Sequence, residues 1–171
     1  MIKFFFKLFF IFNLLLIQVS QSSETNNLVF IDMDYLIKNA EIGKKTLKIL
    51  DTKNSTNLKI LKEKEVKLKK QETELQNKKN IISSEEFNNE IKVLKIKINE
   101  LRNEKKQLAI DFNKFKNDEF NKLLNKYNVV IQEYMKKNSI DIILDKKNIY
   151  IGKVSSDITE PVLQQINTKY K

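Results

Sequence analysis

The stretch that decides the fold is residues 58–115, which read LKILKEKEVKLKKQETELQNKKNIISSEEFNNEIKVLKIKINELRNEKKQLAIDFNKF. Apolar residues recur there every seven positions. With apolar residues also found at many positions between them, they form one stripe along a helix, as in the seam between two packed helices. The two ladders are Leu61, Leu68, Leu75 and Ile82, followed by Phe87, Leu94, Leu101, Leu108 and Phe115.

The break between the two ladders predicts that a second helix begins near Ser84. Ser83 is placed to accept the N–H of Glu86, whose carboxylate can reach back to the N–H of Ser83, and apolar residues on either side can close over this capping box. We predict an antiparallel hairpin in which facing residue numbers sum to about 166. Leu68 would then lie near Ile98. A coiled coil that only dimerises, without a turn, is the alternative.

Composition favours helices and removes most enzyme classes. The 171 residues include 2 Gly and 1 Pro, and 32% are charged, which is typical of long helices. There is no Cys or His, so the chain has no nucleophilic Cys, no His base and no Cys/His zinc site. Paired carboxylates such as Glu85/Glu86 and Glu63/Glu65 are interpreted as cap and surface charges. We therefore predict no enzyme, no cofactor and no metal site.

The first 22 residues have the pattern of a signal peptide. Lys3 and Lys7 precede an apolar run, residues 8–17, and small polar residues follow at 20–23. The apolar run of about ten residues is too short to span a bilayer. We predict an exported chain whose residues 1–22 are cleaved, with an uncleaved membrane anchor as the alternative.

The two ends of the chain predict three strands and short helices. Apolar, β-branched runs at 28–31 and 140–145 predict two strands, and 149–151 with Val154 predicts a third strand that forms a hairpin with the second. Asp34 is the expected N-cap of a helix that follows the first strand. Gly43 is expected to weaken that helix by about 1 kcal/mol relative to Ala, and close packing of this glycine against a neighbouring strand is the alternative. A last helix is expected through Val162, Leu163 and Ile166, with Pro161 in its first turn.

A second apolar stripe follows Phe115 and predicts a packed core. It is bulkier than the hairpin seam, and its helix is expected to end at 136–138. Its members are Phe120, Leu124, Tyr127, Ile131 and Tyr134.

These elements predict an α+β fold that is mostly α. A long antiparallel helical-hairpin arm (52–116) projects from a small discontinuous β body (27–51 and 117–168). The body is too small to bury a core alone and leaves open strand edges, so we expect its strands to be shared in an oligomeric barrel. The expected oligomer contacts are Val29, Ile31, Ile142, Leu144 and Tyr150.

Nearly all of the excess positive charge lies on the arm. Residues 53–116 hold 16 lysines and one arginine against 10 acidic residues, a net charge of +7. This charge favours an acidic partner: an unfolded acidic polypeptide, anionic lipid or lipopolysaccharide. Nucleic acid is disfavoured by the signal peptide, the single Arg and the lack of a base-reading module. A solvated helix face is the ordinary explanation. The expected binding strip is Lys92, Lys95, Arg102 and Lys106.

Four charged residues occupy seam positions of the ladders. We expect their side chains to reach the edge of the seam and solvent. A thin seam whose helices can splay apart is the alternative. These residues are Glu65, Glu72, Lys79 and Lys105.

The end motifs and the arm together resemble the Skp (OmpH) family of periplasmic chaperones. The motifs are VFIDMD at 29–34, IDIILD at 140–145 and DITEPVL at 157–163, and the resemblance covers 27–167. Pro161 departs from the family pattern. The resemblance implies a periplasmic homotrimer with a central barrel and three arms around a cavity. It also implies an ATP-independent holdase that keeps unfolded outer-membrane proteins soluble.

Two other functions stay open at this point. A structural or tethering coiled coil of the envelope would bind anionic lipid or lipopolysaccharide and leave unfolded proteins unaffected. A nucleic-acid binder would keep residues 1–22 intact in the cytosol.

Residues 52–57 predict a hinge at the root of the arm. They contain no apolar side chain and few good helix formers, and the apolar phase slips across them. An ordinary stutter in a long coil is the alternative. Replacing Asn54, Ser55 and Asn57 with Ala should stiffen this stretch and slow its hydrogen exchange. Exchange at 52–57 that is already as slow as at 120–134 in the unmodified chain would contradict the hinge.

Overall fold

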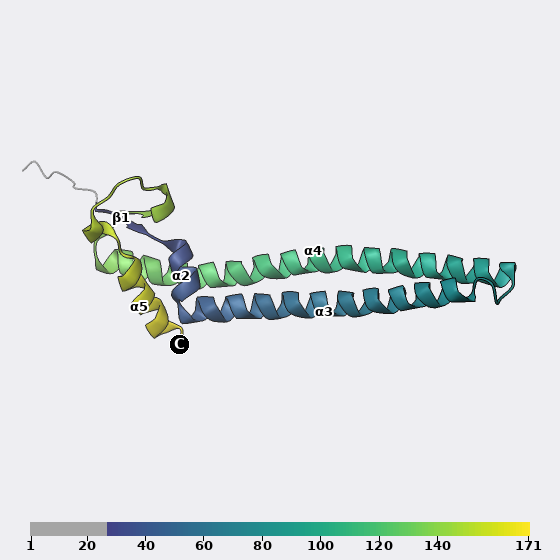
Figure 1. Cartoon of the computed structure of the whole chain (residues 1–171). Helices are drawn as coiled ribbons and strands as arrows, with labels where there is room; N and C mark the ends of the chain where they lie inside the picture. The colour runs from purple at the N-terminus through teal and green to yellow at the C-terminus, as the bar shows by residue number, and fades with distance from the viewer. Residues whose placement is uncertain (1–26) are drawn as a thin grey trace, which may run out of the picture.

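A computed structural model describes residues 27–171. The predicted signal peptide at 1–22 lies outside the described residues. The chain forms an elongated hairpin of two helices with a small body at one end, as Figure 1 shows. The elements, with η marking short 3-10 helices, are β1 (Leu28–Ile31), α2 (Met33–Asn39), α3 (Glu41–Lys78), α4 (Ser84–Lys137), β2 (Ile142–Asp145), η1 (Lys146–Asn148), η2 (Val154–Ser156) and α5 (Thr159–Lys169).

The two strands pair in parallel at the top of the body. Val29 lies opposite Ile143, and Phe30 lies opposite Leu144. Parallel neighbours cannot be joined by a tight turn, and here the connection between them is α2, α3 and α4. The arm is therefore the crossover of a two-stranded parallel sheet.

The predicted third strand is wrong. Residues 149–153 have no regular structure, and the chain passes instead through η1 and η2. Lys146 forms an ion pair with Asp157 at 2.7 Å, which draws the two ends of this segment together. The segment leaves Tyr150 and Ile151 almost fully exposed. The apolar run at 149–151 with Val154 predicted a strand, but within residues 27–171 it pairs with neither β1 nor β2.

The first helix begins earlier than predicted, and Asp34 is not its cap. The Asp32 carboxylate accepts the N–H of Tyr35 at 2.8 Å and caps α2. The N–H of Asp32 donates to the Thr159 hydroxyl at 2.9 Å, so this residue is held in an extended conformation where β1 ends. A tertiary contact with α5 therefore decides which of the two aspartates is the cap.

A break at Ala40 separates α2 from α3. Ala40 is extended and fully buried, and the N–H of Glu41 donates to the Asn167 side chain of α5 at 2.8 Å. Just beyond, a Cβ built on Gly43 would lie 2.1 Å from the carbonyl oxygen of Ile37 and 2.7 Å from the Tyr127 hydroxyl. The close packing is present, but against α2 and α4 and not against a strand.

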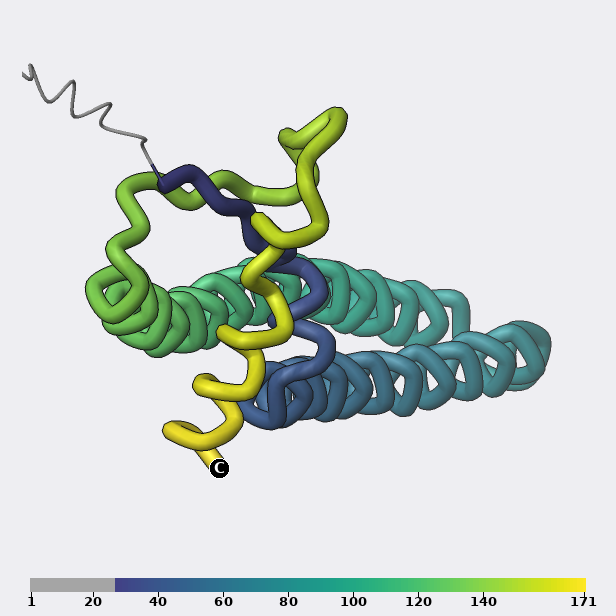
Figure 2. The backbone as a smooth tube through the Cα atoms, turned by 90° about the vertical axis from the view of Figure 1, so that its left-hand side faces the viewer, coloured from purple at the N-terminus to yellow at the C-terminus, as the bar shows by residue number. Residues whose placement is uncertain are grey.

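The core forms where α2 and α5 pack on the last turns of α4. Figures 1 and 2 show α5 crossing the root of the hairpin. Tyr127 is completely buried, and its hydroxyl donates to the carbonyl oxygen of Leu36 at 3.1 Å. Burial raises the pKa of Tyr127 to about 12. The largest fully buried side chains are Tyr127, Leu36, Leu123, Ile166, Val130 and Val162.

The second apolar stripe was predicted in part. Tyr127 is central, and Phe120, Ile131 and Tyr134 pack against the core. Leu124 is only partly buried and lies outside this cluster, whereas Leu123 and Val130, which the stripe omitted, lie inside it. The helix ends at Lys137 with Asn138 as C-cap, as predicted, and Ser139 takes the positive φ of 52° that reverses the chain into β2.

A Gly43→Ala substitution should destabilise the body by about 1–3 kcal/mol, because the added methyl group meets backbone and cannot be accommodated by a side-chain movement. In an exposed helix the same change would stabilise by about 1 kcal/mol. Urea unfolding followed by circular dichroism measures the effect. Lys62→Ala, at an exposed position of α3, is the control and should change stability by about 0.5 kcal/mol or less. A stabilised Gly43→Ala variant would contradict the close approach.

Candidate functional site: the surface of the arm

The two arm helices are held in register by polar pairs across the seam. Lys64 bonds to Glu104, and Lys97 donates to Gln71 at 3.3 Å. A third pair, Lys78 with Glu90 at 3.8 Å, lies nearer the tip. On each helix the partners are seven residues apart, and the residue numbers of every pair sum to 168. The predicted reversal is therefore confirmed, with a register two residues from the expected one.

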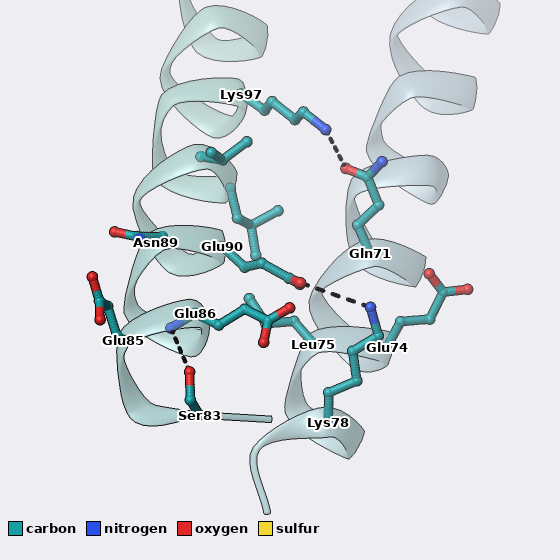
Figure 3. A pocket seen from close by; sticks show the side chains of 12 residues that line it. Gln71, Glu74, Leu75, Lys78, Ser83, Glu85, Glu86, Asn89, Glu90 and Lys97 are labelled. Atoms are coloured by element: carbon teal, nitrogen blue, oxygen red, sulfur yellow. Dashed lines mark hydrogen bonds and ion pairs between the residues drawn. The ribbon is translucent and has the colours of Figure 1, made fainter. Parts of the chain in front are cut away.

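The tip is built on the predicted cap. The N–H of Glu86 donates to the Ser83 hydroxyl at 3.2 Å, and α4 begins at the next residue. Beside this turn lies a groove of about 670 Å³ between the helices, shown in Figure 3. Leu75 and Val93 supply apolar surface there. Four glutamates and two lysines line it as well: Glu74, Glu85, Glu86, Glu90, Lys78 and Lys97.

The predicted basic strip lies on one helix and faces solvent. Lys92, Lys95, Arg102 and Lys106 are all exposed on α4. Successive members are three, seven and four residues apart, which places them on one side of a helix over about 21 Å. No ion pair engages any of the four within residues 27–171. Their role in binding stays a prediction.

The charged seam residues reach the edge of the hairpin. Glu65, Lys79 and Lys105 are exposed. Glu72 is partly buried and pairs with Lys69 at 2.9 Å. This arrangement agrees with side chains that bend outward, and splaying of the two helices stays a prediction.

The arm also exposes apolar side chains that sequence analysis did not single out. Ile96 is 57% exposed and Ile110 is 54% exposed, both on α4 close to the basic strip. Val66 on α3 is similarly open. They could have been found by asking which apolar residues fall outside the two ladders. The arm thus presents apolar and cationic side chains together.

A second groove, of about 590 Å³, lies at the root of the arm. Ile49 of α3 and Phe115 of α4 provide its apolar surface. Sequence analysis used Phe115 only as a seam residue and missed the groove. The available signal was the spacing of Lys45, Ile49, Thr52 and Thr56, which are four, three and four residues apart along α3. Residues with this spacing share one side of a helix. The remaining lining residues are Lys45, Lys48, Thr52, Lys53 and Thr56.

The residues expected to mediate oligomerisation fall into two groups. Val29 and Ile31 are buried in the core of this chain. Ile142 and Leu144, on β2, are 44% and 36% exposed, and Tyr150 is fully exposed on the loop that follows. The structure of one chain leaves their role in an assembly as a prediction.

The body contributes one tightly held carboxylate. Partial burial raises the pKa of Asp157, but hydrogen bonds from Lys146 and Thr159 outweigh it and keep that pKa below its usual value. The carboxylate therefore anchors the loop to the start of α5. Within residues 27–171 no three His, Cys, Asp or Glu side chains are grouped to hold a metal ion. No helix in that range has both the length and the apolar character needed to cross a bilayer.

A long, basic, two-helix arm on a small body of strands and short helices defines a class of arm-bearing proteins. The comparison with protein families identifies the family to which this chain belongs. The model of the family described as outer membrane protein (OmpH-like) matches residues 27–166, and the chain belongs to that family. This confirms the resemblance found in the sequence.

Solved structures agree with this assignment. The chain is similar to an OmpH-like protein from Caulobacter crescentus CB15, a candidate outer membrane chaperone, with a TM-score of 0.79. The two are 16% identical, and the match covers 85% of this chain and 86% of the other. At this identity the similarity supports the fold. No curated protein matches the chain.

Ser83→Ala should loosen the tip of the arm and leave the body unchanged. Loss of an N-cap hydroxyl costs about 1 kcal/mol, so amide exchange over 84–90 should become about fivefold faster. Ser84→Ala is the matched control, because Ser84 is already inside the helix, and it should have little effect. Hydrogen exchange measured by mass spectrometry tests both variants. Equal effects would mean that the cap does not fix the turn.

Proposed function

We propose that this protein is an ATP-independent holdase chaperone that binds unfolded outer-membrane proteins in the periplasm. The observation that carries the proposal is the match to the OmpH-like family over residues 27–166, which spans arm and body together. The description of the Caulobacter crescentus protein as a candidate chaperone agrees with it. The short apolar segment preceded by Lys3 and Lys7 supports export.

The surface of the arm suits a client without fixed structure. An unfolded chain offers scattered apolar side chains and carboxylates, and the arm offers exposed Ile96 and Ile110 beside the cations at 92, 95, 102 and 106. Exposed contacts of this kind are individually weak. Many of them along an elongated surface retain a client by multivalency, and each can open without an energy source. Nucleotide is therefore unnecessary for release.

The assembly that we propose is a homotrimer whose three bodies (27–51 and 117–168) form a central barrel and whose arms (52–116) surround a cavity. On its outer side β1 is bonded through Phe30 to residues 157–158, but the outer edge of β2 has no partner within residues 27–171, and proteins rarely leave such an edge open. Exposed Ile142, Leu144 and Tyr150 add apolar surface beside that edge. A closed, symmetric assembly would pair the strand edge with another subunit and cover the exposed apolar side chains. Light scattering of residues 23–171 should give three times the mass of the chain, and a folded monomer would contradict the assembly.

The mature protein should suppress aggregation of a denatured outer-membrane β-barrel protein diluted from urea, at one trimer per client. Glutamine at the four strip positions (Lys92, Lys95, Arg102 and Lys106) should raise the amount needed for half-suppression about fivefold at low salt, because the attraction to acidic clients is lost. Turbidity and light scattering measure both.

The control variant carries the same charge change on the body. It replaces Lys38, Lys136, Lys137 and Lys153, which are exposed and form no ion pair in the described part of the chain. It should behave like the unmodified protein. No suppression at any ratio, combined with salt-sensitive sedimentation with anionic vesicles, would favour a lipid-tethering protein instead. The net charge of +7 on the arm is the feature that such a function would use.

A further inference from the structure

The groove at the root of the arm combines apolar surface and lysine side chains within one groove. Its apolar surface comes from Ile49, which is 48% exposed, and from Phe115 of the opposite helix. Its remaining walls include Lys45, Lys48 and Lys53. The groove at the tip has some apolar surface from Leu75 and Val93, but its lining is mostly polar and includes four glutamates. The basic strip on α4 is cationic, but it lines neither of these two grooves.

The three lysines of the root groove have no carboxylate partner. None of them forms an ion pair or a side-chain hydrogen bond within residues 27–171, although lysines elsewhere on both arm helices do. Lysine stems cover apolar surface while their ammonium groups stay in water. The groove therefore offers an apolar surface and three free positive charges.

The hydroxyl of Thr56, which lines the groove, needs no hydrogen-bond partner from a ligand. The hydroxyl of Thr56 already donates to the carbonyl oxygen of Thr52 at 2.8 Å. An apolar ligand group can lie against this part of α3 without leaving that donor unpaired, which would otherwise cost binding free energy.

We propose that the root groove binds a short extended segment of unfolded polypeptide in which an aromatic or large aliphatic residue is flanked by acidic residues. The apolar side chain would lie on Ile49 and Phe115, and the carboxylates would meet Lys45, Lys48 and Lys53. This inference rests on the proposed holdase function and assigns part of the client to one place. From residue 45 to residue 56, α3 rises about 16 Å, which matches about five extended residues.

A labelled heptapeptide tests the chemistry directly. The probe is fluorescein-GDWDFDG, measured by anisotropy with the full mature protein. Its two controls are GNWNFNG, which lacks the charges, and GDADADG, which lacks the aromatic rings. Both controls should bind at least fivefold more weakly than the probe. Equal binding of all three peptides would overturn the proposal.

Matched variants locate the site. Ile49→Ser should weaken probe binding about fivefold, and Val66→Ser, an exposed apolar residue of the same helix outside the groove, should change it less than twofold. A triple change to Gln at 45, 48 and 53 should weaken it about tenfold at low salt, and most of that difference should vanish at high salt. The matched triple change is at Lys59, Lys62 and Lys67, which are exposed on α3 and unpaired in the described structure. Equal losses in both triples would show attraction by net charge alone and would overturn the proposal.

Photo-crosslinking separates this inference from the proposed function. Because the chain has no cysteine, Thr52→Cys carrying benzophenone is a single probe in the groove, and Thr73→Cys on the same helix is its control. A denatured β-barrel client should crosslink at 52 at least fivefold more than at 73. Suppressed aggregation without crosslinking at 52 would overturn the groove and leave the holdase standing. No suppression by the unmodified protein would overturn the holdase itself.

Two other occupants are outcomes of the same experiment. Crosslinking at 52 to a second copy of the chain, in the absence of client, would make the groove a contact between subunits. If phosphatidylglycerol vesicles protect the cysteine at 52 from a thiol reagent and the peptide probe does not bind, the groove would be a lipid site. Either result would overturn the proposal.

Discussion

The parallel pairing of β1 (28–31) with β2 (142–145) is the constraint on which the rest of the structure depends. Parallel neighbours need a long connection that returns to the end where it began. An arm that leaves the body and comes back satisfies this requirement if its two helices are antiparallel and in register. The seven-residue ladder of polar pairs supplies the register, since each pair sums to 168. Carried to the root, the same register brings residue 41 opposite residue 127, where Gly43 and Tyr127 do meet.

That register also explains why the two arm helices differ in length. The helix α3 has 38 residues and α4 has 54, so the last turns of α4 have no partner on α3. Tyr127 lies opposite the start of α3, and the turns beyond it carry Val130 into the core cluster, which also contains residues of α2 and α5. One continuous helix is thus half of the arm and the centre of the body. The root of the arm and the packing around Tyr127 therefore lie on the same helix.

Local patterns predicted the elements that local interactions determine. The heptads, the Ser83 cap and the strand at 28–31 follow from spacing and side-chain chemistry over a few residues, and all three are present. Apart from the two-residue shift in the register of the arm, the errors lie where a residue far away in the sequence determines the local structure. Thr159 fixes Asp32 and not Asp34 as the cap, Asn167 meets the chain at the Ala40 break, and the pair Lys146–Asp157 shapes the loop where a third strand was expected. For the candidate site, spacing placed the basic strip on one exposed face. The spacing did not reveal the root groove. That groove lies between residues 45–56 of α3 and Phe115 of α4, and the heptad pattern had placed Phe115 in the seam.

The thinness of the arm follows from the same sequence and bears on what it can bind. Between residues 53 and 116 only Asn57, Leu61 and Leu75 are buried, and seam residues such as Leu94 and Leu101 are half-buried, so each seam residue of the hairpin gains less hydrophobic stabilisation than a core residue of the body. Exposed ion pairs such as Lys78–Glu90 add about 0.2–1 kcal/mol each. A two-helix arm of this kind keeps its register but cannot provide deep pockets, and its binding surfaces are open grooves and side-chain strips. Each such surface holds a ligand weakly. Under the holdase function proposed above, retention of a long unfolded client would come from several surfaces acting together. A client that begins to fold and withdraws its exposed side chains would then lose these contacts one at a time.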